Sequence, residues 1–134
     1  MAWTASEMIR LLLARGDRAG ADRVLDDPAV WPEPAEAGSR EYLLNAEAMV
    51  ALADGDWERA RTRALELLES ARKIGWPNVV ASRVWWVGRI FGAELAGGDD
   101  ALEQARKQLE TNHWVQSLHE PEFVLESIVA EPAR

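Results

Sequence analysis

Near its middle the chain reads Leu52-Ala53-Asp54-Gly55-Asp56-Trp57-Glu58-Arg59-Ala60. An apolar helical pattern ends at this glycine, and a second one, with apolar residues three and four positions apart, begins after it. Glycine takes the left-handed conformation that ends many helices without a steric cost. The next residue, Asp56, can cap the following helix by accepting backbone N–H bonds. Because the connection is short, the run predicts two antiparallel helices that meet at Gly55.

Two similar runs lie on either side of this one. Gly16 and Asp17 separate apolar helical patterns in the N-terminal part, and Gly98 and Asp99 do so farther along. The spacing is 39 residues from Gly16 to Gly55 and 43 residues from Gly55 to Gly98. A helical pair that recurs at such a period predicts an all-α array in which each pair packs on the next.

The expected architecture is a single all-α domain over residues 1–134. Its parts are about three antiparallel hairpins and a short C-terminal capping helix, at residues 3–26, 40–74, 78–110 and 113–131. A loop is expected over residues 27–38, which hold three prolines and a glycine. The first helix of the third hairpin is expected to span 78–96, and residues 120–122 to open the final helix.

The central run resembles the bend of a tetratricopeptide repeat, which holds a glycine, a small polar residue, an aromatic, two polar residues and an alanine. Ala64 follows where that family packs its second helix, and Leu44 and Ala48 fit the positions of its first helix. The family's ordinary repeat is about 34 residues long. The longer period here is similar to the extended repeats of bacterial signalling and transcription regulators. The resemblance covers residues 3–110 and implies a right-handed superhelical array, or α-solenoid.

The resemblance also implies a function, namely protein binding by a scaffold or regulatory domain. In the family, the first helix of each hairpin lines a concave groove that grips a peptide or helix. The same stripe in this chain gives the candidate groove residues Trp3, Ser6, Arg10, Tyr42, Asn45, Met49, Ser82, Trp85 and Arg89. Aromatic and arginine side chains are enriched at binding hot spots. An acidic segment or a free carboxylate would suit Arg10 and Arg89, because arginine holds carboxylates through paired bonds.

Several alternatives stay open at this stage. The final helix could fold back into the groove, with Arg89 paired to a neighbouring glutamate. The apolar end faces of a short array could form a homodimer, because solenoids need polar caps. The chain could also be a self-associating or ligand-sensing part of a larger bacterial regulator. A small-molecule site or an enzyme would need a closed pocket in place of an open groove.

Composition argues against several classes of function. The net charge of −8 disfavours direct binding to nucleic acids, whose phosphates it would repel. The chain has no cysteine, and His113 and His119 are not spaced to share a helix face, so no metal site is expected. No phosphate-binding loop or nucleophile motif occurs, which predicts neither catalytic residues nor a cofactor.

The sequence also suggests where the protein resides. No apolar run approaches the roughly 18 residues of a membrane span, and the N-terminus lacks a signal-peptide pattern. No membrane partner is therefore expected, and the expected location is the cytoplasm.

Seven tryptophans are many for 134 residues. Trp57 occupies the packing aromatic position of the resemblance and is expected in the core. Trp76 is expected to fill the space between the second and third hairpins. Trp85 and Trp86 point about 100° apart on one helix, so at least one of them is a candidate for an interface.

Overall fold

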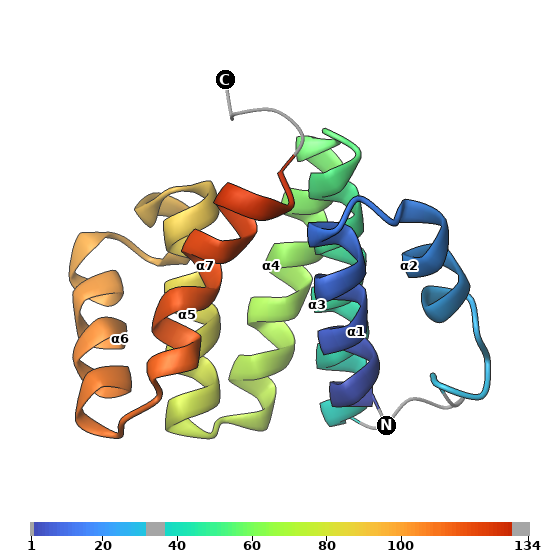
Figure 1. Ribbon diagram of the computed structural model, residues 1–134. Coiled ribbons are helices and arrows are strands. Elements are labelled where there is room, and N and C mark those ends of the chain that lie inside the picture. The colour runs from blue at the N-terminus through green and yellow to red at the C-terminus, as the bar shows by residue number, and fades with distance from the viewer. Residues whose placement is uncertain (1, 32–36, 130–134) are drawn as a thin grey trace.

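The computed structural model describes residues 2–31 and 37–129, and the regular elements in this part of the chain are all helical (Figure 1). This confirms the all-α prediction for the described residues. The helices are α1 (Ala2–Ala14), α2 (Arg18–Leu25), α3 (Ala37–Ala53), α4 (Trp57–Ile74), α5 (Pro77–Phe91), α6 (Asp99–Thr111) and α7 (Val115–Ser127), with a 3-10 turn, η1 (Ala93–Ala96), between α5 and α6.

The first two Gly-Asp bends form as the sequence predicts. Gly16 and Gly55 have φ of 78° and 75°, the left-handed conformation in which glycine avoids a Cβ clash. Asp17 accepts a hydrogen bond from the Gly20 N–H at 2.8 Å, and Asp56 accepts one from the Arg59 N–H at 3.1 Å. The bends between α1 and α2 and between α3 and α4 therefore follow from local chemistry.

The third bend is built differently. Gly97 and Gly98 both have positive φ, and Gly98 caps α6 without a side-chain hydrogen bond. Asp99 and Asp100 lie inside the first turn of α6, where the positive end of the helix dipole favours carboxylates. The helix expected over 78–96 is also interrupted, because α5 ends at Phe91 and Gly92 turns the chain with φ of 111°.

The helices pack mainly on their neighbours in the sequence. α1 packs against α2 and α3, α3 against α4, α4 against α5, and α5 against α6. Figure 1 shows these six helices in a row, from α2 at one end to α6 at the other. The last helix, α7, departs from this order and packs on α5, α6 and also α1.

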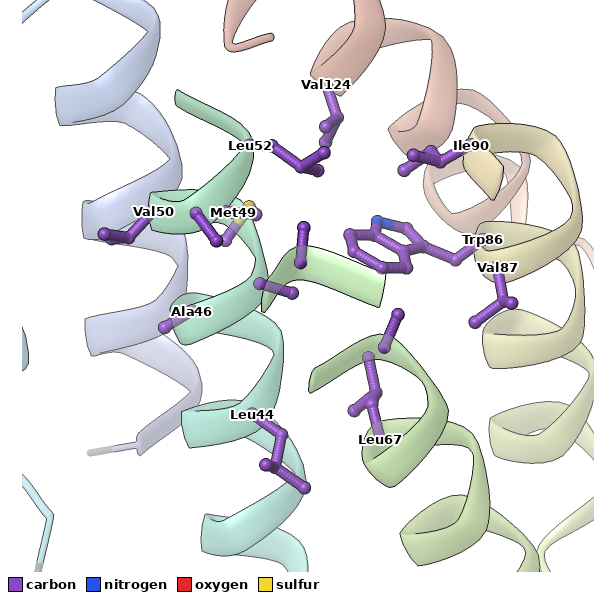
Figure 2. Packing of buried hydrophobic residues seen from close by; sticks show 14 of the residues in the cluster. Leu44, Ala46, Met49, Val50, Leu52, Leu67, Trp86, Val87, Ile90 and Val124 are labelled. Atoms are coloured by element: carbon purple, nitrogen blue, oxygen red, sulfur yellow. The ribbon is translucent and has the colours of Figure 1, made fainter. Parts of the chain in front are cut away.

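The core joins α7 to the central helices. Trp86 extends from α5 into a cluster that includes Met49 and Leu52 of α3, Leu67 of α4 and Val124 of α7 (Figure 2). Each of these side chains is fully buried. Burying one such side chain contributes about 1.5–3 kcal/mol relative to exposure. The final helix is thus part of the hydrophobic core as well as a cover at its edge.

The C-terminal helix differs from the sequence prediction in its start. It runs unbroken from Val115 to Ser127 and contains Pro121, whereas a new helix was expected to open at residues 120–122. Proline inside a helix removes one backbone hydrogen bond. Pro121 is fully buried, so its ring gains packing contacts that offset this loss. Residues 130 and 131 of the expected capping segment lie outside the described residues.

Two tryptophan predictions change in the structure. Trp57 is only half-buried, and its ring meets Phe91 edge-on at 5.7 Å. The prediction for Trp76 was wrong, because its side chain is 68% exposed. Trp76 has extended backbone angles immediately before Pro77 and does not fill a space between helices. Of the adjacent pair, Trp86 is buried in the core and Trp85 is half-buried.

None of the described helices combines the length and the apolar character that a membrane span requires.

Candidate functional site

A polar pocket of about 310 Å³ lies where the first turns of α1, α3, α5 and α7 meet. Within α1, α3 and α5 the lining residues stand three and four positions apart, so each helix presents one face to the pocket. The segment before α7 and its first turns close the remaining side. The lining residues are Trp3, Ser6, Glu7, Glu41, Tyr42, Asn45, Val79, Ser82, Arg83, His113, Trp114, Val115, Gln116, Ser117 and Glu120.

A buried ion pair forms part of the pocket wall. The Arg83 Nε of α5 donates to the Glu41 Oε1 of α3 at 2.6 Å, and both side chains are more than nine-tenths buried. Removing one partner of such a pair typically costs about 3–5 kcal/mol, because the other charge stays buried. Among the described residues, the Arg83 Nη1 has no hydrogen-bond partner.

Asn45 connects α3 to α1 beside this ion pair. Its Nδ2 donates to the Ser6 Oγ at 3.2 Å. Asn45 is only 4% exposed, and its Oδ1 finds no hydrogen-bond partner within the described part of the chain. A buried acceptor without a partner costs about 1–3 kcal/mol. Buried polar atoms of this kind are usually satisfied by water or by a ligand.

Glu120 brings a carboxyl group from α7 to the same pocket. Burial raises the pKa of Glu120, and the negative charge of Glu7 acts in the same direction. Arg83, Arg10 and a hydrogen bond from Asn45 oppose this shift in the pKa. No ion pair within 4.0 Å involves Glu120 among residues 2–31 and 37–129. Burial also raises the pKa of the neighbouring Tyr42 hydroxyl, and the charge of Glu41 adds to the effect.

Helix α7 covers the rest of the face that was expected to be a groove. The Trp85 Nε1 donates to the Leu118 backbone oxygen at 2.9 Å. The Arg89 Nε donates to the Glu122 Oε1 at 3.2 Å, and the Arg89 guanidinium lies 5.4 Å from the Trp85 ring. These contacts correspond to the alternative in which the final helix folds back on the array.

Arg10 also has its partners within the chain. It pairs with Glu7 one turn earlier on α1, at 2.5 Å. Its guanidinium lies 4.7 Å from the centre of the Phe123 ring of α7. Neither Arg10 nor Arg89 is therefore a free cation in this structure.

The nine predicted groove residues separate into three groups. Five of them, from three helices, line the pocket: Trp3, Ser6, Tyr42, Asn45 and Ser82. Three others contact residues of α7: Arg10, Trp85 and Arg89. Met49 is fully buried in the core.

The stripe prediction missed the charged residues of the pocket. Glu7, Glu41 and Arg83 each stand one position from a predicted residue. Because Glu41 of α3 and Arg83 of α5 both lie beside the stripe, an ion pair between these two helices could have been predicted from the sequence. Glu120 carried no such signal, because it reaches the pocket only when α7 folds back. Among the described residues, no group of three or more His, Cys, Asp or Glu side chains is arranged to hold a metal ion.

The chain matches no protein-family model, no curated protein and no solved structure at a significant level.

Proposed function

We propose that the chain is a TPR-like binding module that holds the end of a protein or peptide partner in this pocket, in a scaffold or regulatory role. The succession of packed pairs α1–α2, α3–α4 and α5–α6 supports a helical-repeat array. The observation that carries the proposal is that Trp3, Ser6, Tyr42, Asn45 and Ser82, predicted as binding residues from three separate helices, surround one pocket.

The shape of the site favours the end of a segment over its middle. Helix α7 occupies the adjoining part of the face, so a long peptide would first have to displace it. Trp3, Trp114 and Val115 are exposed and line the pocket, while its deeper wall holds the buried Asn45 and Arg83. Such a site suits a terminal side chain with an apolar stem and a polar head. In a larger bacterial regulator, the same pocket would serve as the sensing site.

Site-specific photocrosslinking tests the proposal. Trp3 is replaced by p-benzoylphenylalanine, and a matched control carries the same residue in place of Trp76, which is also exposed but lies outside the pocket. We expect position 3, and not position 76, to yield a discrete adduct in cells of the source organism. Adding Gln116→Trp, which fills the pocket from α7, is expected to remove this adduct.

Two outcomes of this experiment would contradict the proposal. Equal labelling from positions 3 and 76 would indicate surface encounters in place of a site. An adduct that persists when Gln116→Trp blocks the pocket would show that the partner binds α1 outside the pocket.

Self-association is a second candidate function. Met8 and Leu11 of α1 are exposed, and an apolar hollow of about 450 Å³ lies between α1 and the short helix α2. A second copy of the chain could cover this surface. Sedimentation at several concentrations tests the idea, with Leu11→Glu compared with Leu65→Glu on α4. A wild-type protein that stays monomeric throughout would exclude it.

A further inference from the structure

The charges that line the pocket do not balance. Glu7, Glu41 and Glu120 contribute three carboxyl groups, and Arg83 is the one arginine among the described lining residues. Arg83 is paired with Glu41, and Glu7 is paired with Arg10, which does not line the pocket. Glu120 is left without a cationic partner within 4.0 Å in the described part of the chain. The unmatched group in the pocket is therefore an acid.

A second, independent observation concerns the hydrogen-bonding groups. Asn45 lines the pocket and is more than nine-tenths buried, and its Oδ1 has no partner among the residues that the structure describes. An amide oxygen can only accept, so it calls for an N–H or O–H donor. The unpartnered Arg83 Nη1 calls for an acceptor. The protein encloses both atoms, so a molecule in the pocket reaches them only through a small movement of these side chains. A molecule that bonds to both carries a donor and an acceptor a short distance apart.

The aromatic residues favour a cation as the donor. Trp3, Tyr42 and Trp114 line the same pocket. The face of an aromatic ring carries partial negative charge and attracts ammonium groups within about 6 Å. The net charge of −8 on the whole chain would add to this attraction at long range.

The N-terminal turns of the helices around the pocket do not change its preference for cations into one for anions. The first turn of a helix has unpaired N–H groups and attracts anions. At this pocket the chain supplies its own anions, because Glu41 and Glu120 lie within the first two turns of α3 and α7. A free anion would meet carboxyl groups already in place.

We propose that the pocket binds a small organic cation, an ammonium group on a compact skeleton that also carries a hydroxyl or carbonyl oxygen. The ammonium group lies against Glu120 and the aromatic side chains, and the oxygen accepts from Arg83. The N–H of a primary ammonium, or the hydroxyl group of choline, donates to the Asn45 Oδ1. This inference rests on the proposed function, because it assigns a ligand class to the same pocket; on a protein partner the cation would be a terminal amine or a lysine head group.

Three probes of nearly equal shape separate charge from size. Choline is the quaternary cation, 3,3-dimethylbutan-1-ol is its neutral carbon isostere, and 3,3-dimethylbutanoate is the anion. Ethanolamine serves as the primary ammonium. Titration calorimetry measures affinity, and the indole N–H signals of Trp3 and Trp114, assigned with Trp→Phe variants, report the site. We expect choline or ethanolamine to bind at least about tenfold more tightly than the neutral and anionic probes.

Matched variants locate the charge that is responsible. Glu120→Gln keeps the shape and removes the charge, and Glu126→Gln makes the same change at an exposed position of α7 outside the pocket. We expect Glu120→Gln to weaken cation binding about tenfold or more, and Glu126→Gln to leave it unchanged.

A second pair of variants repeats the test at exposed positions. Gln116→Lys adds a competing cation to the pocket lining from an exposed position, and Gln104→Lys adds the same charge on α6. We expect only Gln116→Lys to weaken binding of the cation.

Each contrary outcome has a distinct meaning. If the neutral isostere binds as tightly as choline and Glu120→Gln has no effect, the assignment to cations is wrong while the proposed binding function stands. If none of the four probes binds or shifts the two indole signals, the inference is overturned. The photocrosslinking at position 3 then decides the proposed function separately.

Discussion

At the scale of single residues, Glu120 shows how burial of a carboxyl group can reduce stability. Burial raises its pKa above the ordinary value of 4.5, so the folded protein keeps this proton to a higher pH than the unfolded chain does. Between the unfolded and the folded pKa, the folded state holds more protons. Its stability therefore falls as the pH rises through this window, and the loss persists above it.

The change Glu120→Gln removes this titration. We expect the variant to be more stable than the wild type at pH 7, with a difference that shrinks as the pH falls toward 4. Urea denaturation followed by circular dichroism at several pH values measures this difference. Glu126→Gln, which lies on the same helix, is the control. A Glu120→Gln protein that is less stable at pH 7 would show that the ionised carboxylate supports the fold.

Asp54, which forms an ion pair with Arg18, shows the opposite effect to Glu120, because its pKa is lowered. Two nearly parallel hydrogen bonds, at 2.8 and 2.9 Å, join Arg18 of α2 to the bend after α3. The hydrogen bond from Arg18 lowers the pKa of Asp54. The stability that this carboxylate contributes is present above its unfolded pKa and is lost as the pH falls through the folded pKa.

We expect Asp54→Asn to cost about 0.5–1 kcal/mol at pH 7, because both side chains are more than a third exposed and water screens the pair. Chemical denaturation measures this cost, and a double-mutant cycle with Arg18→Gln isolates the contribution of the pair. A cost that is unchanged at pH 2.5 would rule out the ion pair as its cause.

At the scale of elements, α7 is attached to the array by a few identifiable contacts. Trp85 bonds to the Leu118 backbone oxygen, Arg89 bonds to Glu122, and Val124 fills a place in the core. The hydrogen bond from Trp85 joins residues 33 positions apart in the sequence. It holds the first half of α7, which also forms one side of the pocket.

We expect Trp85→Phe to loosen α7 without unfolding the chain. The ring packing is largely kept while the hydrogen bond is lost, which removes about 0.5–1.5 kcal/mol of stability. Hydrogen exchange with peptide resolution is expected to speed up in residues 115–122 and to stay unchanged in α4. Uniform acceleration over all helices would mean that α7 does not open by itself.

At the scale of the whole molecule, the core explains why α7 is more than a cover. Trp86 is fully buried in the cluster that α3, α4, α5 and α7 share (Figure 2). We expect Trp86→Ala to cost about 3–5 kcal/mol through lost burial and a cavity. Trp76→Ala, at an exposed tryptophan, is expected to change stability by less than about 0.5 kcal/mol. Thermal denaturation compares the two, and equal costs would contradict the assignment of Trp86 to the core.

The helices and the first two bends could be predicted from local sequence. Gly55 and Asp56 act on backbone groups within four residues, so their neighbours are sufficient to specify the bend. The apolar stripe of α4 is local in the same sense, and its members Ala60, Ala64 and Leu67 are all buried. The stripe of residues that lines the pocket was partly predictable too, since helical spacing places Tyr42 and Asn45 on one face.

The placement of α7 and the residues that line the pocket depend on long-range contacts. The contacts that hold α7 join residues 33 positions apart, and the Arg83–Glu41 pair joins residues 42 apart. Helical periodicity describes which face of a helix is apolar, but not which distant helix covers it. Pro121 predicted the start of a helix from its neighbours alone. In the structure α7 continues through Pro121, and packing of its buried ring offsets the lost backbone hydrogen bond. The unpaired acid of the pocket, Glu120, exists as a site feature only because these long-range contacts bring α7 to the array.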